Sequence, residues 1–155
     1  MRRVLAETGA EPMAALGRGC PTYAGLPVDA SSHWFDPASA GSGFSVQLWT
    51  QYEYYAAFVY DGQGSARFLA AEGVYSGQAV ATLGLEQLRG TPPTSFWQGN
   101  PQRFPVGTLR RTLASGKLVG IDVTATFTDG VPGAWSASNL VQPLGGEGTT
   151  QGCEP

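Results

Sequence analysis

The only histidine of the chain, His33, lies close to an acidic residue and two serines, the residue types that nucleophilic catalysis combines. A histidine titrates near neutrality and could act as a general base, with Asp36 orienting it and Ser31 or Ser32 attacking. Residues this close in sequence rarely reach that geometry, and no Gly-x-Ser-x-Gly motif presents a serine. We therefore expect a structural or surface histidine. A hydrolase using His33 with Asp36 stays as an alternative.

Paired carboxylates, which carry out glycoside hydrolysis, are the second possible chemistry. Turns account for Asp36, Asp61 and Asp129, because each precedes a proline or a glycine. Asp122 differs because it lies between Ile121 and Val123 in a strand of alternating apolar residues. Its side chain therefore points to the face opposite the apolar row. We expect it to face water. A pair made of Asp122 and a second carboxylate is the other form of the hydrolase alternative.

No metal site or cofactor site is predicted. Two cysteines and one histidine cannot complete a zinc site. The segment Asp61-Gly62-Gln63-Gly64 lacks the series of oxygen ligands that a calcium loop needs. Its glycines are not followed by a helix that could receive a phosphate.

Aromatic side chains suggest a function more strongly than the polar residues do. Trp49 ends a strand pattern at an outward position, Tyr52 lies in a turn, and Trp97 lies in a Pro-rich segment. Exposed planar rings bind sugar faces or partner proteins with a large contact area and little entropy to lose. Packing of a ring between sheet and loop is the alternative for any one of them. The predicted binding residues are Trp34, Trp49, Tyr52, Tyr55, Phe96 and Trp97.

Short apolar segments between turn residues predict an all-β protein. Hairpin turns such as Asp61-Gly62 and Ser115-Gly116 connect them, and no helix is long enough to form a crossover. We predict an antiparallel meander of about seven to eight strands, closed as a barrel or sandwich so that its edges are not exposed. The clearest segments are 44–49, 53–60, 66–71, 78–83, 106–113, 119–127 and 134–141.

Two segments carry more specific expectations. Residues 53–60 are apolar on both faces, which is typical of a central, well covered strand. Residues 84–105 hold four prolines and are expected to form a long loop. A loop of that length in a compact domain is usually functional, or else it hides an element that the pattern misses.

Composition limits the domain organisation and the partners. The chain has 155 residues, with 42% hydrophobic and only 14% charged residues, which suits one β domain over residues 20–155 after a tail of residues 1–19. The formal net charge of −3 argues against a nucleic-acid partner. The pair Arg110-Arg111 makes no basic patch, because neighbours in a strand point to opposite faces. No apolar run reaches about 18 residues, so no membrane span is expected.

The two cysteines, Cys20 and Cys153, lie at the ends of the predicted β domain. A disulfide between them would tie these ends together and stabilise the fold by about 4 to 5 kcal/mol in the chain-entropy model. It requires an oxidising compartment, and two unrelated thiols are the alternative. The basic start of the chain is not followed by the apolar core of a signal peptide.

One stretch carries a pattern of aromatic, Asp-Pro and glycine residues, written His33-Trp34-Phe35-Asp36-Pro37, Ala40-Gly41-Ser42-Gly43-Phe44, Val46-Gln47 and Tyr60-Asp61-x-x-Gly64. Over residues 32–73 the chain resembles β-rich modules of exported bacterial proteins, which are often appended to extracellular enzymes. Arg67-Phe68 stands where those modules usually have a tryptophan. The resemblance implies an exported β-rich fold with an accessory role, and it transfers no catalytic residue.

Together these observations predict a non-catalytic, extracellular or periplasmic binding or accessory module without a cofactor. It would recognise a glycan or a protein partner through exposed aromatic rings. A structural subunit of an extracellular assembly, in which the chain forms a homo-oligomer, is the first alternative. The hydrolase is the second.

Overall fold

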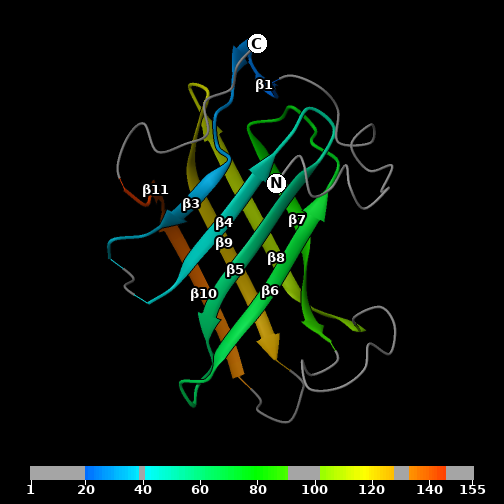
Figure 1. Ribbon diagram of the computed structural model, residues 1–155, viewed down its shortest axis with the longest axis vertical. Coiled ribbons are helices and arrows are strands. Elements are labelled where there is room, and N and C mark those ends of the chain that lie inside the picture. The colour runs from blue at the N-terminus through cyan, green and yellow to red at the C-terminus, as the bar shows by residue number, and fades with distance from the viewer. Residues whose placement is uncertain (1–19, 39–40, 91–101, 128–132, 146–155) are drawn as a thin grey trace, which may run out of the picture.

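The structure, a computed structural model, describes residues 20–38, 41–90, 102–127 and 133–145, and only the backbone of residues 135–139. Within these ranges every regular element is a β-strand, which confirms the predicted all-β class (Figure 1). The described part of the chain contains no helix that is long and apolar enough to cross a bilayer. Residues 1–19, the predicted tail, lie outside the described residues. So does Cys153, and the Cys20–Cys153 disulfide therefore stays a prediction.

The strands follow one another along the chain with short connections. They are β1 (Thr22–Tyr23), β2 (Leu26–Pro27), β3 (Ser32–Phe35), β4 (Gly43–Leu48), β5 (Glu53–Tyr60), β6 (Ala66–Gly73), β7 (Val80–Arg89), β8 (Gln102–Ala114), β9 (Lys117–Phe127), β10 (Gly133–Leu140) and β11 (Gln142–Pro143).

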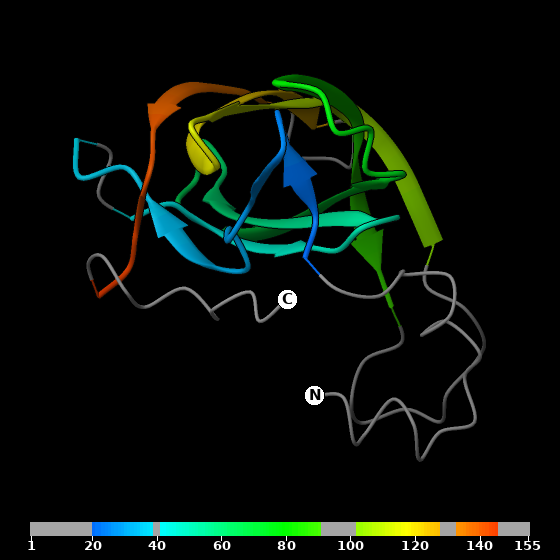
Figure 2. The same cartoon turned by 90° about the horizontal axis from the view of Figure 1, so that it is seen from above.

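Nine of these strands form one antiparallel sheet in the order β10-β9-β8-β7-β6-β5-β4-β3-β11. From β3 to β10 each strand pairs with the next one along the chain, which is the predicted meander. The sheet curls into a barrel-like form (Figure 2). Strands β1 and β2 make a separate small hairpin at one end of it (Figures 1 and 2).

One short segment joins the two edges of the curled sheet. Strand β10 pairs with β9, and the Val141 amide then donates a hydrogen bond to a β9 carbonyl at 3.3 Å. The chain continues directly into β11, where Gln142 pairs with Phe35 of β3, and the Leu144 amide donates to the His33 carbonyl at 2.7 Å. Backbone groups at both edges are thereby paired at this end of the sheet, which removes part of an exposed edge.

The core fills the inside of the curl with alternate residues of each strand, because side chains in a strand point to opposite faces in turn. In β9 the predicted alternation is confirmed, with Ile121, Val123, Ala125 and Phe127 all buried. The core receives side chains from most strands of the sheet, among them Trp34, Phe44, Val46, Tyr55, Val59, Leu69, Leu85, Leu109 and Ile121.

Much of the expected long loop over residues 84–105 is strand, so this prediction is wrong at both ends. Strand β7 continues to Arg89, and β8 begins at Gln102. Pro105 lies within β8 opposite Glu86, where the register between the two strands shifts. A proline has no amide to donate, and a bulge accommodates it within a ladder. Strand β7 also begins later than expected, at Val80.

The prediction that residues 53–60 are covered on both faces is wrong for the last part of the outer face. Tyr55, Ala57 and Val59 point inward and are buried, but the side chains of Phe58 and Tyr60 are 48% and 53% exposed. The sheet curls around a single core, and within the described residues no further layer packs on this half of its outer surface. Phe58 and Tyr60 therefore lie in water, whereas the outward Ala56 is covered, at 4% exposed.

Strand β8 passes very close to β9 at Gly107, and this contact can be tested. A Cβ atom there would lie 1.8 Å from the Thr124 carbonyl oxygen, whereas a Cβ at Gly84, in the neighbouring strand, meets no atom within 4 Å. We expect Gly107→Ala to lower the free energy of unfolding by about 1 to 3 kcal/mol or more. Gly84→Ala should change it by no more than about 0.5 kcal/mol. Urea denaturation of both variants checks this, and equal effects would contradict the close approach.

Candidate functional site

Two of the predicted binding residues belong to the core. Trp34 is 5% exposed and Tyr55 is 1% exposed, so the prediction that they are exposed binding rings is wrong. Both occupy inward positions of their strands, and each satisfies its polar atom inside the protein. The Trp34 indole donates to the Ala30 carbonyl at 2.8 Å, and the Tyr55 hydroxyl donates to Glu53 at 2.8 Å. Phe96 and Trp97 lie outside the described residues.

The structure brings the other two, Trp49 and Tyr52, together in the tight connection between β4 and β5. The Trp49 amide donates to the Tyr52 carbonyl at 2.8 Å, which closes the turn. The ring centroids are 5.9 Å apart at an interplanar angle of 36°. Both side chains are half-buried. We call these two residues the ring pair.

A polar network on neighbouring strands extends from the ring pair. The Tyr52 hydroxyl donates to one carboxylate oxygen of Glu72 on β6. Arg103 of β8 donates from Nη1 to the other Glu72 oxygen at 2.5 Å and to Glu86 of β7 at 3.0 Å. The members come from four separate parts of the chain, so no local motif marks them. Only the strand register, which sequence spacing does not give, places them on one surface.

The network shifts the pKa values of two of its members. The Tyr52 hydrogen bond, helped by Arg103, outweighs partial burial and lowers the pKa of Glu72 below its usual range. Partial burial, then the hydrogen bond and charge of Glu72, raise the pKa of Tyr52 well above that of a free tyrosine. Near neutral pH the network therefore consists of an ionised carboxylate and a protonated hydroxyl.

On the outer face of the hairpin formed by β5 and β6, three exposed rings form what we call the aromatic patch. Phe58 of β5 pairs with Phe68 of β6, and their ring centroids are 5.6 Å apart. Phe68 is 39% exposed, and Tyr60 extends the patch toward the end of β5. The three rings line a surface pocket of about 250 Å³ together with Gly41, Val59, Ala66 and Arg67. Sequence reasoning missed the patch because an apolar strand was interpreted as a covered one.

The turn between β5 and β6 holds the aromatic patch in place. The buried Asp61 carboxylate accepts hydrogen bonds from the Gln63 amide at 2.9 Å, the Ser65 amide at 3.0 Å and Arg67 Nε at 2.9 Å. Burial would raise the pKa of Asp61, but these bonds and the Arg67 charge outweigh it and lower the pKa. Gly64 adopts φ = +78°, which favours glycine at that position.

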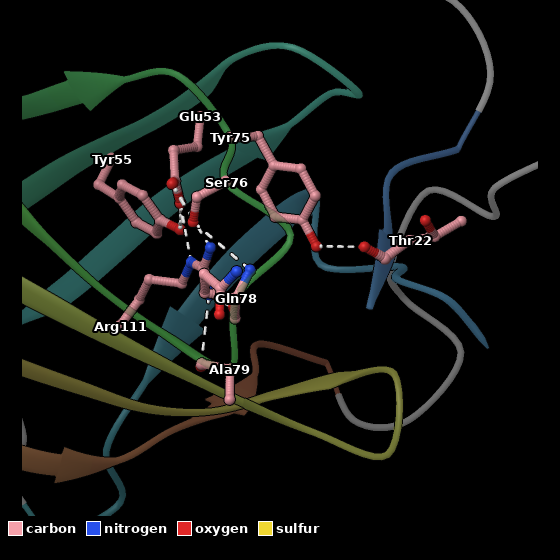
Figure 3. Close-up of polar contacts among 8 residues, drawn as sticks. All are labelled: Thr22, Glu53, Tyr55, Tyr75, Ser76, Gln78, Ala79 and Arg111. Carbon is pink, nitrogen blue, oxygen red and sulfur yellow. Dashed lines mark hydrogen bonds and ion pairs between the residues drawn. The ribbon is translucent and has the colours of Figure 1, made fainter. Parts of the chain in front are cut away.

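A buried ion pair occupies the interior at the end of the sheet nearest the β1–β2 hairpin (Figure 3). Glu53 and Arg111 are both fully buried, and Arg111 Nε donates to Glu53 Oε2 at 2.8 Å. Arg111 Nη1 also donates to the carbonyls of Gln78 at 2.5 Å and Ala79 at 3.3 Å. A buried ion pair needs such additional hydrogen bonds to offset the loss of water.

Two tyrosines complete this interior cluster. The Tyr55 hydroxyl donates to Glu53, and burial followed by the Glu53 charge raises its pKa well above 10.0. The Arg111 guanidinium lies 5.2 Å from the ring centroid of Tyr75, whose hydroxyl donates to the Thr22 carbonyl at 2.9 Å. The cluster therefore connects β5, β8, the β6–β7 connection and β1. Every group in it has a structural partner.

Two of the candidate catalytic residues, Asp36 and Asp122, make contacts that serve the fold. His33 is exposed on β3, as expected of a surface histidine. The Asp36 carboxylate accepts the Ala38 amide at 2.8 Å, so it stabilises a turn. Asp122 faces outward and binds Arg110 at 2.9 Å, which confirms its predicted hydrated position. Within the described ranges no three histidine, cysteine or acidic side chains gather as metal ligands.

No family model, curated protein or solved structure matches the chain. The described surface offers the ring pair with its polar network at one end of the β5–β6 hairpin and the aromatic patch at the other.

The buried ion pair predicts that replacing either of two neighbouring arginines of β8 has very different effects on stability. Arg111→Met leaves the Glu53 carboxylate buried without its cation, and we expect it to cost about 3 to 5 kcal/mol of stability. Arg110→Met, which breaks an exposed pair with Asp122, should cost less than about 1 kcal/mol. Adding Glu53→Leu to Arg111→Met should recover much of the loss. Chemical denaturation measures all three, and a double variant no more stable than Arg111→Met would contradict the role of the pair.

Alkaline pH gives a second test, through Tyr55. Its raised pKa means that the folded protein keeps a proton which the unfolded chain loses above pH 10. Stability from this group is complete below that pH and falls as the pH rises toward the folded pKa. The decline should approach about 1.4 kcal/mol per pH unit. We expect the decline to be shallower by that amount in Tyr55→Phe, measured as the free energy of unfolding between pH 9 and about 11.5. A slope in Tyr55→Phe equal to that of the parent protein would contradict the raised pKa of Tyr55.

Proposed function

We propose that the chain is a non-catalytic binding or accessory module, exported from the cell, that recognises a glycan or a protein partner on the outer face of β5 and β6. The observation that carries the proposal is the aromatic patch, whose three rings are about 40 to 50% exposed on one strand pair. Large exposed aromatic clusters on otherwise well packed proteins mark interaction surfaces.

The outer face of the hairpin supports an elongated ligand. The outward positions of β5 are Tyr54, Ala56, Phe58 and Tyr60, which span about 20 Å of strand. Ala56 pairs with Ala70 of β6, so two small side chains separate the aromatic patch from the polar network. Both alanines are buried, at 4% and 6% exposed, so the exposed rings lie toward the two ends of this face. Rings at two separated places along one strand pair suit an extended chain such as a glycan or a peptide.

The engagement of the polar residues supports a role without catalysis. Asp61, Asp36 and Glu53 each accept hydrogen bonds that hold a turn or the core. The Asp36 carboxylate accepts the Ala38 amide and the Ser31 hydroxyl donates to the Leu48 carbonyl, so both groups hold the local fold rather than orient His33. The assembly alternative depends on residues 1–19, outside the described residues.

The proposal predicts that ligand retention depends on the outer rings. Immobilised neutral and acidic polysaccharides and a random-peptide display library are the probes. We expect the protein to retain or select at least one class, and Trp49→Ala or Phe58→Ala to weaken that binding at least about tenfold, as for a hot-spot residue. Equal thermal unfolding of the variants shows that the fold is intact.

Leu140→Ala is the control for this experiment, because Leu140 is an exposed apolar side chain on β10, remote from β5 in the sheet. It should bind like the parent protein. Binding that survives all aromatic replacements would contradict the proposal. So would release of hydrolysed glycan that disappears in His33→Ala.

A further inference from the structure

The ring pair lies directly beside the polar network, and Tyr52 belongs to both. The centroid of its ring is 5.9 Å from that of the Trp49 ring, and its hydroxyl donates to Glu72. A tyrosine fixed at its hydroxyl and in a closed turn cannot turn away, so the ring is preorganised. Preorganised rings lose little entropy when a flat ligand stacks on them.

Donors and acceptors alternate over a short distance in the network. The two hydrogen bonds from Arg103 to Glu72 and Glu86 both use Nη1, so the other guanidinium hydrogens are not used by this network. The three side chains are about one third to one half exposed. A sugar hydroxyl can accept from the guanidinium while donating to a carboxylate, and neighbouring hydroxyls can do both at once.

The charge of the network selects among sugars. Glu72 and Glu86 contribute two negative charges and Arg103 one positive charge, which leaves a net charge of −1. The whole chain is also negative, at −3. A uronate or a sulfated sugar would meet repulsion here, whereas an uncharged sugar would not.

We propose that Trp49, Tyr52, Glu72, Arg103 and Glu86 form a subsite for one uncharged sugar ring with neighbouring hydroxyls. The inference rests on the proposed binding function and names its ligand class. The sugar ring stacks on the ring pair, and its hydroxyls bond to the network. The pocket at the aromatic patch has one charged lining residue, Arg67, which is paired with Asp61, so the patch extends the contact mainly with apolar area.

Titration calorimetry with neutral oligosaccharides, namely gluco-, xylo- and manno-oligosaccharides, tests the subsite against oligogalacturonate of equal length. We expect at least one neutral series to bind at least about tenfold more tightly than the uronate. Trp49→Ala and Glu72→Gln should each weaken neutral binding by at least about fivefold. Glu86→Gln should narrow the preference for neutral over charged sugars, because it brings the local charge to zero.

Asp122→Asn provides a matched control. Asp122 is a carboxylate of similar exposure that binds an arginine at 2.9 Å, but its partner is Arg110, which lies seven residues further along β8 than Arg103 of the subsite. It should leave sugar binding unchanged. Thermal unfolding of each variant separates loss of binding from loss of fold.

The outcomes distinguish this inference from the proposed function. If a neutral glycan binds, and only Phe58→Ala abolishes it, the subsite is wrong and the binding function stands. Tighter binding of the uronate, or of a selected peptide with no glycan bound, also overturns the subsite alone. If neither glycans nor peptides bind, both fail.

Discussion

The buried pair of Glu53 and Arg111 is the interaction on which the rest of the structure depends. Two charges in the interior are tolerated only because two backbone carbonyls and the Tyr55 hydroxyl complete their hydrogen bonds. These partners come from distant segments, so the pair fixes how β5, β8 and the β6–β7 connection meet. It also fixes the outer surface, since Glu53 pointing inward requires that the adjacent Tyr52 and Tyr54 do not.

A sheet that curls around one core has an inner face full of apolar side chains and an outer face in water. Rings at outer positions are then available to a ligand without any movement of the backbone. The ring pair and the aromatic patch lie at the two ends of strand β5, each anchored by its own turn. The Asp61 turn and the Trp49–Tyr52 turn are therefore both part of the proposed binding function, although neither turn supplies chemistry.

The sequence allows the strands and their meander to be predicted, because the alternation in segments such as β9 is local. It does not reveal the ion pair, since residues 53 and 111 are far apart in the chain. The Arg110-Arg111 pair did carry a signal: one arginine of the two had to face inward and would need a carboxylate there. Trp34 and Tyr55 were misassigned because ring type does not report which face a residue occupies. The strand that contains Pro105 was not predicted because proline usually interrupts a strand, whereas here a bulge accommodates it.

The segment that joins both edges of the sheet has a consequence for how the protein is made. Strands β3 and β9 each keep an open edge until the β10–β11 segment has left the ribosome, because only that segment pairs with both. During synthesis the nascent barrel thus presents two unsatisfied edges, the condition in which chains aggregate. The same segment could equally close the ring of a neighbouring molecule, so reciprocal strand exchange is the misassembly to which this topology is most exposed.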